Sequence, residues 1–577
     1  MTDNTAPSAS GRIRPLAGLT VKNALREATA GITLLAIAVP LNIGYAQIAG
    51  LPPTAGLYAL VLPGIVWVLS VSSRQLVASP DAAAAALVAS SLGGLAVAGS
   101  ADYITLALAQ AIICGGMFLA CSLFRLGFLA DFLSKPILIG FVGGLALDIL
   151  VSQVAKMLGV KIDSGGEFVD KLSGLVTGLG QVNVWSLLIS VGALAILLVG
   201  RRVARAVPWA LVVLVLATVV VVLTGAEKNG VAVLGKIEAG LPRFTWPVLD
   251  WSTWLALVPS AIALTVVAMG EGLLVSRSYG EKRAYPTRPN RELFAFGLSN
   301  LAAGATGGFA VGSSTSRTAA MDQAGSRTQL PTIVTAIGTL ALLLFGTALL
   351  EHIPSPAIGA IVAVAVVPLL GIADFSALWR EDRFEFTIGL VCFLVTLFIG
   401  SIPGIAVAFV LALINLTRRA AAPAIDTLAA DGDPKHSLLD AAAPGAPTAP
   451  GVVVIRFAAP LFFANSGTFG QAVKRAVRLD PAIEHVVVDM EAVTDVDVTG
   501  ADGFRSLREW LDDRSVDLSL SRVRPGLGDR MQHLDLIDGV AVYRTNREAL
   551  SALASLRAEG DARAGSGQPT EEGLDRG

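Results

Sequence analysis

Long apolar runs separated by short polar stretches fill roughly the first three quarters of the chain. An α-helix needs about 20 apolar residues to cross the hydrocarbon core of a bilayer, and most runs approach that length. The pattern predicts fourteen membrane spans, seven in each half of the region. The first seven are 28–49, 55–71, 80–98, 103–124, 136–155, 184–200 and 207–224. The second seven are 254–276, 291–311, 314–326, 331–350, 356–371, 384–400 and 403–417.

The third span of each seven has a pattern that does not suit a simple membrane helix. In the first half, Ser-Pro-Asp at 79–81 precedes five alanines, and in the second half a glycine-rich stretch, 307–313, leads into a hydroxyl-rich one. Short, interrupted segments at matching places in two halves indicate a transporter built from inverted repeats, with its binding site between them. We therefore expect spans 3 and 10 to be discontinuous.

Two half-helix N-termini that face each other near the membrane midplane would form an anion site. Each offers free N–H groups and roughly half a positive charge. Arg317 would add a full positive charge to the second half-helix, and Ser314, Thr315 and Ser316 would add hydroxyl donors. Alternatively, Arg317 snorkels or pairs structurally with an acid.

Acidic residues inside the predicted spans are costly and are usually functional or paired. Glu271 stands between two glycines in span 8. Because burial disfavours an ionised carboxylate, Glu271 is a candidate to carry a coupling proton, although it could also neutralise Arg317. Asp81 and Asp322 could be only helix-terminal or interhelical partners, and we expect Asp148 to be structural.

Positive charge in the loops predicts the orientation. With the N-terminus inside, the inner loops and N-terminal tail carry 20 Lys and Arg residues and the outer loops carry six. Cytoplasmic loops have such an excess, so both termini are expected in the cytoplasm and the spans in the plasma (inner) membrane. This gives a cytoplasmic N-terminal segment, 1–27, and a transporter domain, 28–419.

The charge content changes after residue 419. Charged residues make up about 11% of residues 1–419 and about 25% of residues 420–577, which is the content of an ordinary soluble domain. Residues 420–448, rich in Ala, Pro and Asp, predict a linker. Strands expected at 452–457 and 486–490 alternate with helices, which predicts a small α/β domain at 449–556.

Thr499 is predicted to cap the second of these helices, which runs through Leu511, with Asp502 as its capping-box partner. Residues 557–577 predict a disordered tail. The four histidines lack ligand spacing, so no metal and no other cofactor is expected. Without a nucleophile–base pair, a phosphate loop or a basic patch, the sequence also argues against an enzyme and against nucleic-acid binding.

Several motifs in order resemble the SulP sulfate permease family, known in animals as solute carrier family 26. The resemblance covers about residues 20–555. It rests on Pro-Leu-Asn-Ile-Gly-Tyr-Ala at 40–46, Gly-Leu-Pro-Pro-Thr-Ala-Gly-Leu-Tyr at 50–58, and the stretches 72–76, 79–82 and 316–319. Residues 459–465 and 495–500 are similar to a STAS domain, the usual C-terminal partner of this family.

The resemblance implies a membrane all-α fold of fourteen spans as two intertwined, inverted seven-span repeats, followed by a cytoplasmic α/β STAS domain. A core domain of spans 1–4 and 8–11 would move against a gate domain of spans 5–7 and 12–14 like an elevator. The family also implies a homodimer in the lipid bilayer.

Site residues follow from the same resemblance, position by position. Tyr45 takes the place of the span 1 aromatic that lines the anion pocket. Pro80, Asp81 and Ala82 supply the start of the span 3 helix, Ser316 and Arg317 supply that of span 10, and Glu271 matches the coupling carboxylate of span 8. In free-standing anti-sigma antagonists that share the STAS fold, a hydroxyl at the position of Thr499 is phosphorylated. Thr499 is thus a candidate for regulatory phosphorylation, although helix capping alone would explain it.

Two departures from the family pattern bear on the substrate and the coupling ion. Leu41 replaces the usual glutamine after Pro40, which removes a polar group near the pocket. Val275 stands one turn after Glu271, where a sodium-coupled member would be expected to keep a hydroxyl, and this favours protons.

We expect a secondary active anion transporter that takes up sulfate by proton symport. Within the family, sodium-coupled bicarbonate transport and proton-coupled dicarboxylate transport are the alternatives, and an uncoupled anion channel is a third. The alternative from another class is a membrane-anchored signalling protein in which the STAS domain is the output.

Overall fold

A computed structural model describes residues 15–128, 135–162, 167–204, 207–236, 239–429 and 446–565 of the chain. The chain divides into two compact units, Met1–Ala412 and Leu413–Gly577, and each is described by itself.

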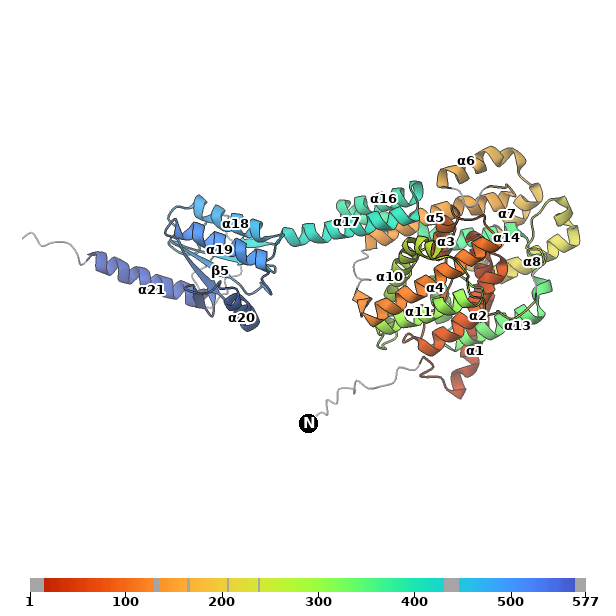
Figure 1. Cartoon of the computed structure of the whole chain (residues 1–577), viewed down its shortest axis with the longest axis horizontal. Helices are drawn as coiled ribbons and strands as arrows, with labels where there is room; N and C mark the ends of the chain where they lie inside the picture. Colours follow the sequence, from red (N-terminus) through yellow and green to blue (C-terminus); the bar gives the residue numbers. More distant parts are fainter. Residues whose placement is uncertain are drawn as a thin grey trace, which may run out of the picture. The chain divides into compact units, whose positions relative to one another are not determined.

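The first unit is built from α-helices (Figure 1). Its first helices are α1 (Val21–Ile48), α2 (Pro53–Ser70), α3 (Ala82–Leu92), α4 (Ala101–Leu123), α5 (Lys135–Leu158), α6 (Phe168–Gly178), α7 (Val184–Val203) and α8 (Trp209–Thr224). They are followed by α9 (Trp251–Ala256), α10 (Val258–Lys282), α11 (Pro289–Ala305), α12 (Thr315–Gln323), α13 (Leu330–Phe345), α14 (Ser355–Val366), α15 (Ile372–Glu381), α16 (Arg383–Phe398) and α17 (Ser401–Ala421). Strands β1 (Ala78–Ser79) and β2 (Gly312–Ser313) are two residues long.

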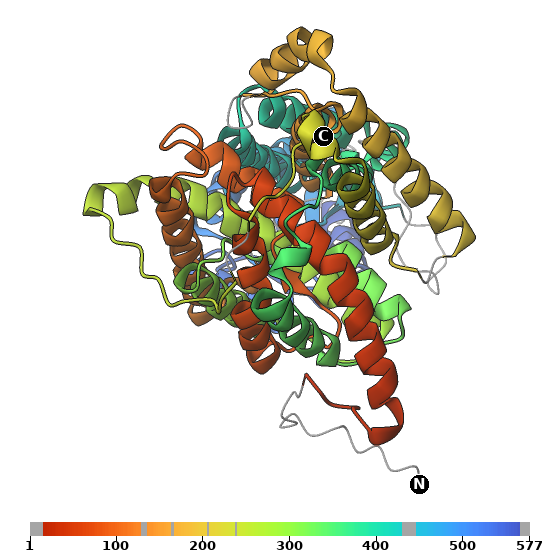
Figure 2. The same cartoon turned by 90° about the vertical axis from the view of Figure 1, so that its right-hand side faces the viewer.

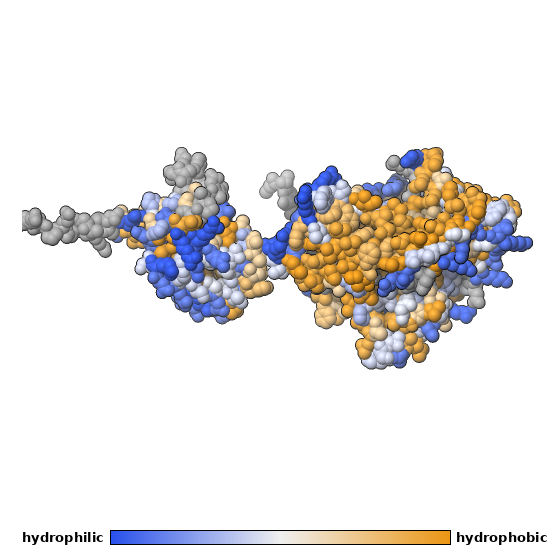
Figure 3. All heavy atoms as spheres, turned by 90° about the horizontal axis from the view of Figure 1, so that it is seen from above, coloured by the Kyte–Doolittle hydropathy of each residue, from blue (hydrophilic) through white to orange (hydrophobic). Residues whose placement is uncertain are grey.

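Seven helical segments in the described residues are long and apolar enough to cross a membrane, or eight if a bent helix pair is one span. That pair, α6 with the following turn and α7, bends by 114°. Three further apolar helices, α3, α8 and α13, are shorter. In Figure 3 this unit presents a broad hydrophobic surface, as expected for a body that faces lipid chains.

Each of the fourteen predicted spans contains a helix, but two short helices, α6 and α15, were not expected. Both are amphipathic, so their apolar residues are interrupted by polar ones. A search for continuous apolar runs of membrane length therefore passes over them.

Close packing of α11 against α4 and α2 forms much of the interior (Figure 1). Phe296 of α11 contacts Trp67 and Phe118, with ring centroids 4.7 Å and 5.4 Å apart. A Cβ atom on Gly115 of α4 would lie 2.9 Å from the carbonyl oxygen of Gly297 in α11, so only glycine permits this approach. In a second group, α1 runs beside α13, as Figures 1 and 2 show.

A five-stranded sheet organises the second unit. Its order is β3 (Ile425–Thr427), β4 (Val452–Phe457), β5 (His485–Asp489), β6 (Asp517–Ser521) and β7 (Ala541–Tyr543). β3 is antiparallel to β4, and the other neighbours are parallel. Its helices are α18 (Ser466–Leu479), α19 (Val498–Asp512), α20 (Pro525–His533) and α21 (Asn546–Gly565). α18, α19 and α20 share a core with one face of the sheet, and α21 packs on the other. The predicted α/β domain is confirmed, and the strands expected at 452–457 and 486–490 correspond to β4 and β5.

Three local predictions for this unit need correction. The linker expected at 420–448 contains β3, because Ile425 and its neighbours pair with β4, a long-range contact that composition does not reveal. The helical part of the segment expected as a tail from residue 557 is longer than predicted, since α21 continues to Gly565, where Ala, Glu and Arg favour the helix although Gly560 does not. Residues 430–445 and 566–577 of these two segments lie outside the described residues.

The third correction concerns the N-cap of α19. The cap is Asp497, not Thr499: an Asp497 carboxylate oxygen accepts a hydrogen bond from the Gly500 amide at 2.6 Å. Asp502 pairs with Arg505 instead of completing a capping box. Thr499 lies in the first turn with an exposed side chain. Helix capping therefore no longer explains the hydroxyl at this position.

The two positions should respond differently to alanine. Asp497→Ala removes the cap and is expected to destabilise α19 by about 1 kcal/mol, whereas Thr499→Ala should change its stability by less than about 0.5 kcal/mol. Hydrogen exchange of the α19 amides in the full-length protein measures both. Equal loss of protection in the two variants would show that the cap is assigned to the wrong residue.

Candidate anion site

Two extended stretches meet inside the first unit, and each leads into a short helix. β1 and β2 pair antiparallel, with Ala78 opposite Ser313 and Ser79 opposite Gly312. Three residues after β1, α3 begins at Ala82, and α12 begins at Thr315, two residues after β2. The pairing therefore brings the N-termini of α3 and α12 close to one another.

Hydrogen bonds from neighbouring helices satisfy the backbone of these stretches, as extended chain at membrane depth requires. The Thr318 hydroxyl of α12 accepts from the Val77 amide at 3.0 Å, and the Ser314 amide donates to the Val77 carbonyl at 3.1 Å. The Asn300 side chain of α11 bonds both the amide and the carbonyl of Val311 at 2.9 Å. α11 thus holds the approach to β2.

Arg317 is completely buried in the first turn of α12. Its Nε donates to the Ser314 hydroxyl at 2.8 Å, and its Nη2 donates to the Pro80 carbonyl across the strand pair. Its guanidinium carbon lies 5.6 Å from the centroid of the Tyr45 ring, which is a cation–π contact with α1. Arg317 therefore connects α12 to α1 and to the stretch before α3.

Several polar atoms of Arg317 and of the strand pair are buried without a partner. They include Arg317 Nη1 and the hydroxyls of Ser79 and Ser313, one from each strand. Leaving a buried polar group unsatisfied costs about 1–3 kcal/mol. The unpartnered Nη1 of the buried Arg317 points to a ligand that accepts hydrogen bonds.

The start of α12 is open on one side. Thr315 and Ser316 are exposed, whereas Ser314 is buried. The amides of Thr315 and Ser316 make no hydrogen bond to other described residues. These two free N–H groups and two hydroxyls supply the donors expected of a helix N-terminus that receives an anion.

Asp81 alters the expected contribution of α3. Its side chain caps the helix by accepting from the Ala84 amide at 2.7 Å, so one of the N-terminal donors is already used. Asp81 also faces Gly312 so closely that a Cβ atom there would collide with the carboxylate. Pro80 and Ala82 on either side of Asp81 are buried. The α3 terminus therefore carries a carboxylate as well as a partial positive charge.

Glu271 lies half-buried in α10, within electrostatic reach of Asp81 and of Tyr45. In the described residues no ion pair joins Arg317 to Glu271 or to any other carboxylate. The site thus contains two carboxylates and one arginine that is not neutralised by direct contact.

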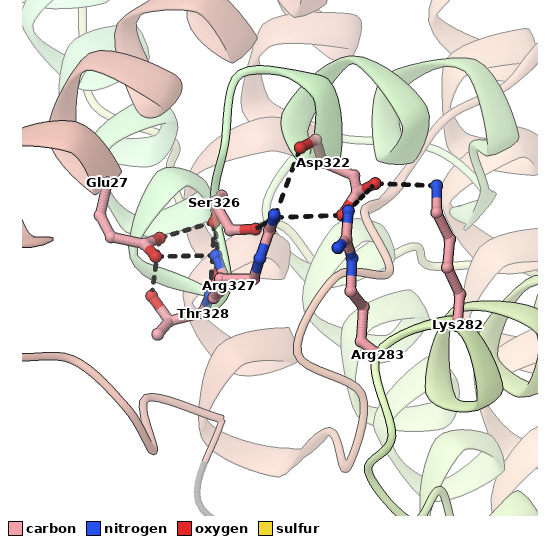
Figure 4. A network of polar contacts seen from close by, with 7 residues as sticks. All are labelled: Glu27, Lys282, Arg283, Asp322, Ser326, Arg327 and Thr328. Atoms are coloured by element: carbon pink, nitrogen blue, oxygen red, sulfur yellow. Dashed lines mark hydrogen bonds and ion pairs between the residues drawn. The ribbon is translucent and has the colours of Figure 1, made fainter.

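Asp322 stands apart from this site and has a structural role. It is nearly buried at the end of α12 and pairs with Lys282, Arg283 and Arg327, at 3.0, 2.7 and 3.3 Å (Figure 4). The expectation of an interhelical partner is confirmed for Asp322. Asp148 likewise forms an ion pair, with Lys171 of α6 at 2.8 Å.

A second carboxylate lies beside this network in Figure 4. Glu27 of α1 is buried and accepts from the Ser326 and Thr328 hydroxyls and from the Arg327 amide, at 2.6 to 2.9 Å. Together, Glu27 and Asp322 connect the segment after α12 to α1 and α10.

Asp322→Asn is expected to lower stability by about 1–3 kcal/mol, because it leaves three cations close together, although they are partly exposed to screening water. Asp374→Asn, which breaks an exposed pair with Lys135 at 3.6 Å, should cost no more than about 0.5 kcal/mol. Thermal unfolding of the purified protein compares them. Equal shifts in the melting temperature would argue against a structural role for Asp322.

Sequence reasoning missed some polar residues that build this region. Ser79 and Ser313 contribute the unpartnered hydroxyls, and Asn300 holds β2. Glu292 of α11 is also buried and bonded to the Ser72 hydroxyl. A polar residue inside an apolar span is a usable signal for Asn300, whereas the serines become significant only through the β1–β2 register.

Both units of the chain match known protein families, and full-length relatives are known. The Sulfate permease family profile matches residues 26–392, and the STAS domain profile matches residues 443–549. A probable sulfate transporter of Mycobacterium tuberculosis is 33% identical over 91% of this chain and 95% of its own length. Sulfate transporter 3.1 of Arabidopsis thaliana is 29% identical over 85% of this chain and 78% of its own length.

Two solved structures share the fold. Murine solute carrier 26 family member A9, an anion transporter, superimposes with a TM-score of 0.85 at 21% identity, over 96% of both chains. The transmembrane domain of the cyanobacterial bicarbonate transporter BicA has a TM-score of 0.59 at 21% identity, over 68% of this chain and 98% of its own.

The apolar helical unit and the α/β unit that follows it define a multi-pass integral membrane transporter with a C-terminal STAS domain, not an enzyme. With a family match over most of the chain, the protein belongs to the sulfate permease family, the SulP or solute carrier 26 anion transporters.

Proposed function

We propose that this protein takes up sulfate into the cell by secondary active proton symport, and that the anion binds between Arg317, Tyr45 and the starts of α3 and α12. The observation that carries the proposal is the buried Arg317, whose Nη1 has no partner and which makes no ion pair in the described residues. The names of the relatives, sulfate transporters of bacteria and plants, support sulfate as the first anion to test.

The donor set suits a tetrahedral oxyanion. Arg317 would offer Nη1, and Thr315 and Ser316 would offer amides and hydroxyls from the open side. Ser79 and Ser313 stand at adjacent positions of the β1–β2 register and face opposite sides of the strand pair, so at most one of their hydroxyls would reach the anion. A planar guanidinium binds oxyanions in a fixed geometry, and donors held rigidly before binding lose little entropy when the anion arrives.

Coupling to protons follows from the charge of the site. With Asp81 and Glu271 ionised and Arg317 protonated, the three side chains carry a net charge of about −1, which repels an anion strongly in a poorly solvated site. Protonation of a carboxylate removes part of this repulsion. Anion and proton would therefore bind with positive coupling, and each would raise the affinity for the other. We assign the coupling proton to Glu271, because Asp81 is engaged as the α3 cap.

The antiparallel β1–β2 pair supports the inverted-repeat part of the proposal. A two-fold axis in the membrane plane would bring two equivalent segments together in opposite directions, as this pair runs. We accordingly propose fourteen spans with discontinuous spans 3 and 10, and a core of spans 1–4 and 8–11 that moves against a gate of spans 5–7 and 12–14. The alternating-access step would carry the β1–β2 site across the membrane.

The excess of positive loops supports a plasma (inner) membrane location with the N-terminus and STAS domain in the cytoplasm. We propose a homodimer on the family resemblance. The exposed Thr499, in the first turn of α19, is a proposed phosphorylation site, since a phosphate is favourable at a helix N-terminus.

Uptake of labelled anions into proteoliposomes tests the substrate. We expect sulfate to enter and unlabelled sulfate to compete better than bicarbonate or a dicarboxylate such as succinate. Preferential uptake of bicarbonate or succinate would replace sulfate as the substrate. No flux of any anion, together with a cellular phenotype of Thr499→Ala but not of Glu271→Gln, would favour the signalling function instead.

A further inference from the structure

A cavity lies where the ends of α2 and α4 meet the start of α11, and it shares no lining residue with the anion site. Its volume is about 970 Å³. Figure 1 shows these three helices side by side. By the loop charges, this is the side of the unit expected to face the cytoplasm.

One wall of the cavity is apolar and continuous with the outer surface of the helices. It is formed by Val66 and Leu69 of α2 and by Phe294 and Leu298 of α11. Leu69 is 75% exposed and Phe294 is 43% exposed. In a membrane, side chains in such positions meet lipid chains, so an acyl chain would find a wall of matching polarity here.

The other end of the cavity is basic. Arg288 is exposed, and its guanidinium makes no hydrogen bond or ion pair to other described residues. Arg291 also lines the cavity, and its Nε donates to the Ser70 carbonyl at 2.9 Å. The nearby carboxylate of Glu292 is fully buried, bonds the Ser72 hydroxyl and does not line the cavity.

Hydrogen bonds to residues at or just beyond the ends of α4 and α2 fix the start of α11, where Arg288 is the N-cap residue and Arg291 lies in the first turn. The Arg288 amide donates to the Ser72 hydroxyl at 3.0 Å, and the Ser122 hydroxyl of α4 donates to the Asn290 carbonyl at 2.7 Å. The Gly127 amide donates to the Asn290 side chain at 3.2 Å. The basic end is therefore built into the fold.

We propose that this cavity binds an anionic phospholipid, with its phosphate between Arg288 and Arg291 and an acyl chain along Leu69 and Phe294. Basic pockets between membrane helices on the cytoplasmic side recognise such headgroups. A free phosphate would use the arginines but not the apolar wall, and a neutral lipid would use the wall but not the charge. The proposal does not depend on which anion is transported.

Binding of phosphatidylglycerol to the full-length protein in detergent, counted by native mass spectrometry, tests the proposal. Phosphatidylglycerol is expected to bind more tightly than phosphatidylcholine. Arg288→Gln should weaken its binding about fivefold, and the double variant with Arg291→Gln about 30-fold, at roughly 1 kcal/mol per arginine. Arg380→Gln, which removes an exposed arginine of α15 on the same expected side, is the matched control and should leave binding unchanged.

The Arg288 side chain makes no hydrogen bond or ion pair to other described residues that Arg288→Gln would remove, so this variant should fold normally. It keeps the test valid if Arg291→Gln, which loses the hydrogen bond to Ser70, does not fold. A diazirine-labelled phosphatidylglycerol should crosslink to residues 66–70 or 287–298 in the wild type. Phe294→Ala is expected to weaken binding of the lipid. Equal binding of the two lipids, loss of binding in Arg380→Gln as large as in Arg288→Gln, or displacement of the lipid by millimolar inorganic phosphate would overturn the proposal.

Discussion

Arg317→Ala is expected to abolish detectable sulfate uptake and to weaken sulfate binding at least about 30-fold. Truncating a buried, hydrogen-bonded charge costs 2–5 kcal/mol or more, and here the lost group is the full positive charge of the site. Arg317→Lys keeps the charge but loses the guanidinium group whose nitrogens donate to Ser314 and Pro80. This variant should therefore bind sulfate with intermediate affinity. Isothermal titration with sulfate and proteoliposome uptake measure the two effects.

Because Arg317 also connects α12 to the start of α3, its loss could unfold the protein. Thermal unfolding of each variant therefore accompanies the binding measurement, and Arg317→Lys keeps the test interpretable if the alanine variant is unstable. Wild-type uptake by a folded Arg317→Ala protein would show that the anion binds elsewhere.

Glu271→Gln should separate binding from coupling. The amide has nearly the same shape but does not take up a proton, so an imposed pH gradient should no longer drive accumulation. Exchange of internal for external sulfate should persist, because the anion contacts around Arg317 remain. The expected accumulation ratio under a pH gradient falls to about one, the value without a driving force.

Glu292→Gln is the matched control for that experiment. Glu292 is a buried carboxylate of α11 that bonds Ser72 and lies outside the strand pair. Its replacement is expected to affect stability but to leave accumulation driven by the pH gradient. If Glu271→Gln still concentrates sulfate, or if both variants lose accumulation equally, Glu271 is not the coupling residue.

Much of the helical pattern could be predicted from sequence, because the apolar runs are long and the bilayer sets their length. A search for long apolar runs missed α6 and α15, because polar residues interrupt their apolar ones. It also does not decide whether short apolar helices such as α8 cross the membrane. Strand β3 was also hidden, since its partner lies about thirty residues away in the chain.

For the site, charge and helix-start chemistry were enough to select Arg317, Asp81 and Glu271, which are costly inside a membrane. What sequence did not supply was their geometry. That Arg317 reaches the Pro80 carbonyl follows only from the pairing of β1 with β2. The Asp81 cap is a local contact within the start of α3, and it uses one of the donors expected for the anion. This changed the expected site from two equivalent helix N-termini to one dominated by α12.

Sulfate accumulation in proteoliposomes under an imposed ion gradient tests the central claim most directly. The vesicles contain the purified protein with no sulfate inside, and radiolabelled sulfate is added outside at acidic or neutral pH, with or without a sodium gradient. The proposal predicts that the acidic exterior alone drives sulfate above its external concentration, and that Arg317→Ala abolishes this. Uptake that ignores both gradients, or that follows sodium alone, would contradict proton symport at this site.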